Sequence, residues 1–298
     1  MRASCSTLLT VALAGCAVTT NTGSMNGYGE GERPHTKPPQ NMTDCHMHII
    51  DPRYPTSRPV KAALLSEYRK LKDRLGIKRN VIVQASFHGT DNRTILDTMA
   101  QIGNSARGIV DVRENVTDAE LKQMDAAGVR GVRFNVRRGD SQAMGRIEYM
   151  SKRIHEYGWH TEMNINPEGT VAAKDIFKRL TAPVVFAHMG HLVRTGWNHP
   201  AREIIEELLQ KERAWVKLSG FYLGSTVGLP SLADSGVIAN AFLKMAPDRL
   251  VWGSDWPHVT APVPQDDARL FDLFAQWVPD ETTRRKILVD NPARLYRF

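Results

Sequence analysis

The segment Thr43-Asp44-Cys45-His46-Met47-His48-Ile49-Ile50 carries two histidines separated by one residue. If this segment is a β-strand, alternation places His46 and His48 on the same face of the strand. Near the end of the chain, the apolar residues 250–254 are followed directly by Asp255. If the first and last strands of a barrel were formed by these segments, the two histidines and the aspartate would meet at one mouth.

The chain between these two segments alternates short β-branched runs with amphipathic segments. Residues 64–75 have helical apolar spacing, and Thr117 with Glu120 forms a capping box for a helix that ends near Gly128. Eight such alternations in about 250 residues predict a single α/β domain over residues 42–298, a parallel (β/α)8 TIM barrel. The predicted strands are residues 44–49, 81–85, 108–112, 131–136, 160–165, 184–188, 215–219 and 250–254.

Polar side chains recur at the ends of the predicted strands. In TIM barrels the residues at the carboxyl ends of the strands line the active site. A doubly wound sheet is the alternative fold, but it gives no reason for polar residues at so many strand ends. In chain order these residues are His46 and His48, Ser86 and His88, Asp111 or Arg113, Arg133 and Asn135, Asn164, His188, Ser219 and Asp255.

The charge of the chain, +7 with a pI of 9.4, favours an anionic ligand or surface. Lysine and arginine are nevertheless scattered among aspartate and glutamate, and no basic run is interleaved with aromatic residues. We therefore exclude nucleic acid as a partner.

The first 16 residues differ from the rest of the chain. Arg2 precedes the apolar residues 8–15, which are too few to span a bilayer but fit the core of a signal peptide. The segment 13–16 looks like a bacterial lipobox, which predicts a lipid anchor at Cys16 and a lipoprotein of the periplasm or cell envelope. The alternatives are a disordered leader or an upstream mis-start, with Met25 or Met42 as the true beginning, and a cytoplasmic protein. Residues 17–41 are rich in Thr, Asn, Gly and Pro, and predict a flexible linker.

Six motifs in the same order carry a resemblance to a known family: Asp44–His48, Ala85–Asn92, Gly131–Asn135, Ala187–Gly190, Trp252–His258 and Asn291–Tyr296. Through them residues 43–298 resemble the amidohydrolase superfamily, and within it the metal-independent branch typified by 2-pyrone-4,6-dicarboxylate lactonase. Sugar-dicarboxylate lactone isomerases are near relatives. The resemblance implies a hydrolase that opens a small anionic, carboxylated lactone.

The same resemblance implies the catalytic roles. His46, His48 and His188 would polarise the lactone carbonyl, and Asp255 would take a proton from the attacking water. His191 is a rival to His188, but the apolar run before His188 favours His188 as the last strand residue.

A metal ion is the main alternative to this chemistry. His46, His48 and Asp255 could hold zinc, as in a zinc-dependent hydrolase or decarboxylase of the same superfamily. The metal-dependent relatives add a lysine at the end of strand four or a histidine at the end of strand five. Here the fourth predicted strand carries Arg133 and Asn135, and a cation would be repelled by Arg133. We predict that no metal is needed.

Arginine binds carboxylates through its planar fork, so Arg133, inside an apolar strand, is predicted to face the substrate. The family pattern suggests Arg138 as a second contact, and Ser86, His88 and Tyr54 complete the predicted substrate-binding set. Residues 219–226, after the seventh predicted strand, contain no arginine, whereas the lactonase has one there. The exact lactone therefore stays open. A non-catalytic carboxylate-binding lipoprotein is disfavoured, because Asp255 would repel its ligand.

Overall fold

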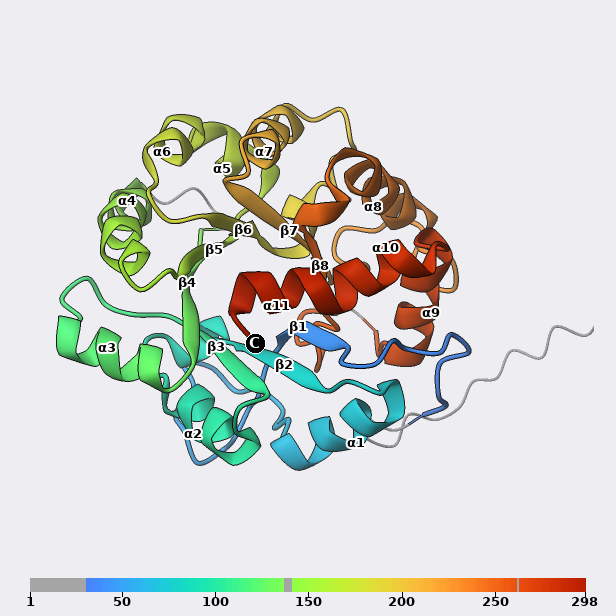
Figure 1. The fold of residues 1–298 in the computed structure, drawn as a ribbon, viewed down its shortest axis with the longest axis horizontal. Helices are drawn as coiled ribbons and strands as arrows, with labels where there is room; N and C mark the ends of the chain where they lie inside the picture. The colour runs from blue at the N-terminus through green and yellow to red at the C-terminus, as the bar shows by residue number, and fades with distance from the viewer. Residues whose placement is uncertain (1–30, 137–140, 262) are drawn as a thin grey trace, which may run out of the picture.

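The computed structural model describes residues 31–136, 141–261 and 263–298. Eight parallel strands form one sheet in sequence order, wound into a barrel with the helices around it (Figure 1). The predicted TIM barrel is thus confirmed. The strands are β1 (Thr43–Met47), β2 (Arg79–Val83), β3 (Ala106–Val110), β4 (Val129–Asn135), β5 (His160–Asn164), β6 (Val184–Phe186), β7 (Ala214–Leu218) and β8 (Leu250–Trp252).

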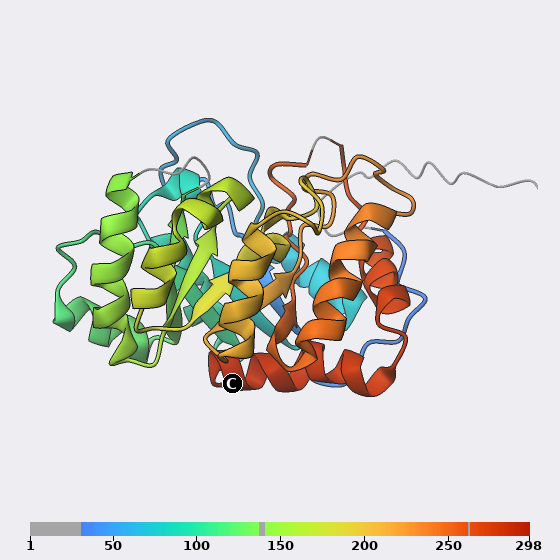
Figure 2. The same cartoon turned by 90° about the horizontal axis from the view of Figure 1, so that it is seen from above.

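The helices lie between successive strands along the chain and on the outside of the sheet. The last ones, joined by a π-helical segment (Lys286–Asp290), run across one end of the barrel, and most of the long loops gather at the opposite end (Figure 2). The helices are α1 (Leu65–Leu75), α2 (Arg93–Ile102), α3 (Asp118–Ala126), α4 (Ser141–His155), α5 (Pro167–Ala172), α6 (Lys174–Arg179), α7 (Ala201–Gln210), α8 (Ala233–Met245), α9 (Asp267–Trp277), α10 (Glu281–Arg285) and α11 (Asn291–Tyr296).

The barrel closes where the segment after β8 meets β1. The Asp255 amide donates to the His46 carbonyl at 2.8 Å, and the His48 amide donates to the Trp256 carbonyl at 2.8 Å. Gly253 permits this approach, because a Cβ atom there would lie 2.6 Å from the Cβ of His46. The two segments that predicted the fold are therefore hydrogen-bonded neighbours.

The local predictions also agree with the structure, with shifted ends. Helix α1 occupies the periodic segment 64–75, and Thr117 caps α3 through a hydrogen bond from the Glu120 amide. All eight strands end one or two residues before the predicted end, because the residues that follow leave the sheet ladder. Ser86–His88, for example, forms a 3₁₀ turn rather than the continuation of β2.

The part of the predicted linker that the structure describes contacts the barrel. The amides of His35 and Thr36 donate to the two carboxylate oxygens of Asp272 on α9, at 2.9 and 2.8 Å. These hydrogen bonds attach residues 35 and 36 to α9. The predicted signal peptide and Cys16 lie outside the described residues. None of the helices in the described part of the chain has the length and apolar character of a membrane span.

Candidate active site

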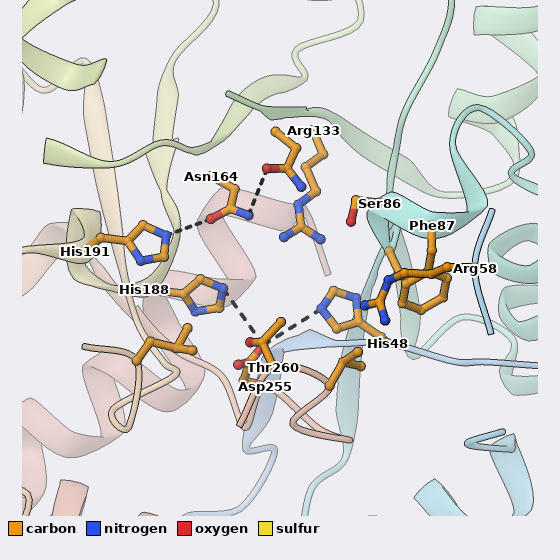
Figure 3. Close-up of a pocket in the computed structure, with 14 residues that line it drawn as sticks. His48, Arg58, Ser86, Phe87, Arg133, Asn164, His188, His191, Asp255 and Thr260 are labelled. Carbon is orange, nitrogen blue, oxygen red and sulfur yellow. Dashed lines mark hydrogen bonds and ion pairs between the residues drawn. The ribbon is translucent and has the colours of Figure 1, made fainter. Parts of the chain in front are cut away.

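A small cavity of about 70 Å³ opens at the carboxyl ends of the strands (Figure 3). The side chains around it come from the carboxyl ends of β4 and β5 and from the segments after β1, β2, β6, β7 and β8, as expected for the active end of a TIM barrel. They are His48, Arg58, Ala85, Ser86, Phe87, Arg133, Asn135, Asn164, His188, His191, Leu223, Asp255, Val259 and Thr260.

The Asp255 carboxylate is the centre of the site, and three histidines surround one of its oxygens. The Nε2 atoms of His46, His48 and His188 lie 3.6, 3.8 and 3.9 Å from Asp255 Oδ1. The other oxygen, Oδ2, accepts a hydrogen bond of 2.6 Å from the hydroxyl of Tyr222. The structure therefore brings together the four predicted catalytic residues. His46 is completely buried beneath the cavity, whereas the other two histidines line it.

The backbone holds two of these residues in a conformation that L-amino acids rarely adopt. Asp255 has φ 65° and His188 has φ 51°, both in the left-handed region. Residues held in this region cluster at functional sites, where the surrounding structure sustains the strain. Here the strained turns direct both side chains into the mouth of the barrel just after β8 and β6 end.

Burial controls the protonation states at the site. It raises the pKa of Asp255 above its ordinary value, and the Tyr222 hydrogen bond together with the charges of His258, Arg133 and Lys217 limits that rise. Burial also lowers the pKa of His48 to about 3. The pKa values of His46 and His188 are held well below 6.5 for the same reason. The three histidines are therefore neutral around pH 7.

The tautomer of a neutral histidine follows from the partner of its other ring nitrogen. His48 Nδ1 lies 2.7 Å from the carbonyl oxygen of Val83, which can only accept, so Nδ1 carries the proton. The Nε2 atom of His48 then presents a lone pair to the cavity. His188 Nδ1 lies 3.0 Å from the Ser219 hydroxyl, which can donate or accept, so His188 can present a proton on Nε2.

Arg133 supplies positive charge to the cavity, on the side opposite Asp255 (Figure 3). Its side chain is 6% exposed, and Nη1 donates to the Gln84 carbonyl at 2.6 Å. The predicted contact Ser86 also lines the cavity. His191 lines the cavity as well, with its ring centre 5.5 Å from that of His188, and its Nε2 bonds Asn164 Oδ1 at 2.7 Å.

The structure places two predicted substrate contacts away from this cavity. His88 lies in the 3₁₀ turn after β2, so strand alternation does not apply to it, and its Nδ1 contacts the Pro55 carbonyl at 3.0 Å. The hydroxyl of Tyr54 donates to Asp97 on α2. Arg138 lies outside the described residues.

Several polar residues near the site, among them Thr260, were not among the predicted site residues. Tyr222 comes from the loop after β7, and exposed Arg58, whose guanidinium lies 5.6 Å from the ring centre of Phe87, comes from the loop after β1. Such loop positions leave no periodic signal. Lys217 and Glu162 are fully buried below the cavity. Lys217 could have been found, since it is a charge inside the apolar strand β7.

The histidines and Asp255 raise the question of a metal ion. Among the described residues, His46, His188 and Asp255 place ligand atoms within 4.8 Å of one another, a trio that differs from the predicted one by His188 in place of His48. Two cations oppose an ion here: Arg133 lines the same cavity, and the Nζ atom of Lys217 lies 3.4 Å from Nδ1 of His46. An ammonium can only donate to Nδ1, which favours the His46 tautomer with its proton on Nε2 and no lone pair toward the cluster. These features oppose a zinc ion, although the three ligand atoms are close enough together to hold one.

Comparison with known proteins gives matches over almost the whole barrel. The family model described as amidohydrolase matches residues 43–298. The 4-sulfomuconolactone hydrolase of Rhizobium radiobacter is 33% identical over 285 residues, 90% of this chain and 95% of the relative. The 2-pyrone-4,6-dicarboxylate hydrolase of Comamonas testosteroni is 33% identical over 294 residues, 92% of this chain and 96% of the relative.

Two further matches extend this comparison. The D-galactarolactone isomerase of Agrobacterium fabrum is 29% identical over 281 residues, 90% of this chain and 95% of the relative. Among solved structures, the apo form of an Agrobacterium tumefaciens protein superposes with a TM-score of 0.84 at 28% identity, covering 91% of this chain and 99% of that one.

Proposed function

Because the chain belongs to the amidohydrolase family, as its motifs predicted, we propose that it is a hydrolase that opens a carboxylated lactone without a metal ion. One observation carries the proposal. A buried carboxylate, Asp255, stands among neutral histidines on one side of the cavity, and Arg133 stands on the other.

The attacking water has a place between two acceptors. Asp255 Oδ1 and the lone pair of His48 Nε2 are 3.8 Å apart, and both border the cavity. A water that donates one proton to each acceptor turns its own lone pairs toward the cavity. Asp255 then takes the proton as the water oxygen attacks the lactone carbonyl, the role of a general base. In this arrangement His48 orients the water, rather than polarising the carbonyl as the resemblance implied.

The lactone carbonyl needs donors where negative charge develops. His188 lines the cavity and can present a proton on Nε2, because the Ser219 hydroxyl can donate to its Nδ1. A donor held in a buried site stabilises the developing oxyanion more than it would in water. After the ring opens, the leaving oxygen needs a proton, which protonated Asp255 can return.

The acidic groups of the substrate have two cations to contact. Arg133 is buried at the back of the cavity and suits a carboxylate beside the ring. Arg58 lies exposed at the cavity and suits a second anionic group that extends toward solvent. Arg58 thus takes the place of the missing arginine after β7. The names of the two hydrolase relatives specify a sulfo-substituted lactone and a pyrone dicarboxylate. We therefore expect a small lactone with two acidic groups.

The test is a hydrolysis screen over matched lactones that carry zero, one or two acidic groups. Turnover should rise with the number of acidic groups, and the product should be the hydroxy acid with one oxygen from solvent. Metal content is measured on the same preparation. If no member of the panel is opened while the protein is folded, the proposal fails.

Lactone isomerisation is the second candidate, favoured by the similarity to the galactarolactone isomerase. In that reaction the acceptors Asp255 and His48 would move a proton or a hydroxyl group within the substrate, with no net uptake of water. An isomeric lactone without solvent oxygen would identify this reaction.

A further inference from the structure

A buried ion pair that takes no part in the steps above lies directly beneath the histidines. Lys217 on β7 and Glu162 on β5 are both 0% exposed, and Lys217 Nζ lies 2.5 Å from Glu162 Oε2. A fully buried pair is weak evidence for stability, because removing both charges from water offsets their attraction. Its contacts indicate a different use.

The ammonium group of Lys217 faces three acceptors. They are Glu162 Oε2 at 2.5 Å, the Cys45 carbonyl oxygen at 2.7 Å and His46 Nδ1 at 3.4 Å. An ammonium has three protons and no lone pair, so each of the three contacts must be a donation from lysine. A proton on His46 Nδ1 would point at another donor. The neutral ring of His46 therefore carries its proton on Nε2.

We propose that the Lys217–Glu162 pair is a positioning device that fixes His46 with its proton on Nε2, directed at Asp255. The proposal deepens the function above and rests on it for the meaning of Asp255. In this arrangement Tyr222 donates to Oδ2 and orients the Asp255 carboxylate, and the Nε2 proton of His46 points toward Oδ1 across 3.6 Å, an electrostatic contact beyond hydrogen-bond range. Oδ1 is therefore left to accept a hydrogen bond from water.

The same ion pair determines whether His46 can bind a metal ion. Glu162 Oε1 lies 3.6 Å from His46 Nδ1, just beyond hydrogen-bond range. Without the lysine, this carboxylate would accept a proton from Nδ1 and leave a lone pair on Nε2, which is the arrangement that orients histidines in metal sites. With Lys217 present, His46 therefore donates a proton from Nε2; without Lys217, its Nε2 could bind a metal ion.

The first experiment needs no variant. In protein labelled with ¹⁵N at histidine, the ring-nitrogen shifts of His46, identified by their loss in His46→Gln, report the tautomer. We expect the protonated nitrogen to be Nε2. A proton on Nδ1 overturns the proposal.

The second experiment compares two variants that each break the ion pair. Lys217→Met removes the donor to Nδ1 and leaves Glu162 as its neighbour, whereas Glu162→Gln keeps the lysine and its donation. Both variants lose one charge of the pair, so a structural role predicts similar behaviour. We expect Lys217→Met alone to move the proton to Nδ1 and to bind zinc at least ~10-fold more tightly than Glu162→Gln, the scale seen for partners of metal-binding histidines.

Zinc binding is measured on folded protein by equilibrium dialysis and elemental analysis. Equal zinc affinity in the two variants overturns the proposal. Should Lys217→Met not fold, the tautomer in wild-type protein still decides. Neither measurement involves a substrate, so an absence of lactone turnover would contradict the proposed function and leave this inference standing or falling on its own data.

Discussion

Replacement of Tyr222 by phenylalanine tests how the Tyr222 hydroxyl controls the pKa of Asp255, the proposed general base. The Tyr222 hydroxyl donates to Asp255 Oδ2 at 2.6 Å, and both residues are buried. This hydrogen bond stabilises the carboxylate form and thereby limits the rise in the Asp255 pKa that burial causes. Tyr222→Phe removes the donor without a change in ring shape. We expect the pKa of Asp255 to rise further.

The size of the shift follows from the strength of the bond. A hydrogen bond to a charged group contributes about 1.5–3 kcal/mol, and one pKa unit corresponds to about 1.4 kcal/mol. The acidic limb of the pH profile for kcat/KM should therefore move up by ~1–2 units, because activity requires the carboxylate. Well above that limb, the variant should lose less than ~10-fold, since a more basic carboxylate accepts the proton more readily.

The higher Asp255 pKa in Tyr222→Phe should also lower the stability of the folded protein near pH 7. A carboxyl group whose pKa is raised in the folded state costs stability above its folded pKa and costs none below its ordinary pKa. The variant should therefore be less stable than wild type near pH 7 and approach it as the pH falls below the ordinary range of aspartate.

The assay is the pH dependence of kcat/KM for a lactone identified in the screen. Tyr157→Phe is the matched control, because the Tyr157 hydroxyl donates to the Asp118 carbonyl, far from the cavity. The acidic limb should move in Tyr222→Phe only. Coincident limbs for wild type and Tyr222→Phe would refute the reasoning, because the titrating group would then not be the carboxylate that Tyr222 contacts.

The remaining predictions test other parts of the site. Asp255→Asn should lower kcat by at least ~100-fold with little change in affinity, and near-full activity would exclude Asp255 as the base. Arg133→Lys should weaken the binding of carboxylated lactones by about 1–3 kcal/mol and leave the binding of uncharged lactones nearly unaffected. An equal loss for both kinds of lactone would contradict a contact between Arg133 and the substrate. Treatment with a chelator should leave activity intact. A loss of activity that zinc restores would mean that the histidines and Asp255 bind a metal ion. Cys16→Ser should release the protein from the membrane fraction, and wild-type protein already free of membranes would contradict the lipid anchor.

The sequence predicted most of the fold because each strand carries its own signal. Short β-branched runs separated by amphipathic segments appear in the order that the barrel uses. The polar residues at strand ends were found for the same reason. The proximity of His46 and Asp255 could also be predicted, because the parallel strands of one barrel bring their carboxyl ends to one mouth.

The loop residues could not be predicted in this way. Tyr54 was a reasonable candidate for the substrate, but its hydroxyl has a partner in Asp97, which no local pattern reveals. Conversely, Tyr222 lies in the loop after β7 and reaches Asp255 only through the path of that loop. Loop conformations depend on tertiary contacts that leave no local pattern, so the sequence identifies the residue types but not their partners.

Buried charges in strands form a third category. The sequence shows that such a charge needs a partner, but it does not identify the partner. Arg133 and Lys217 both interrupt apolar strands, and in both cases the cost of burying a charge requires a partner. Depth in the barrel distinguishes them. Arg133 borders the cavity, where an anionic substrate can reach it, whereas Lys217 lies a layer below with Glu162. In our proposals, one cation selects the ligand and the other fixes the proton on His46, so a mouth lined with residues of metal-ligand type would hold an anion and a water.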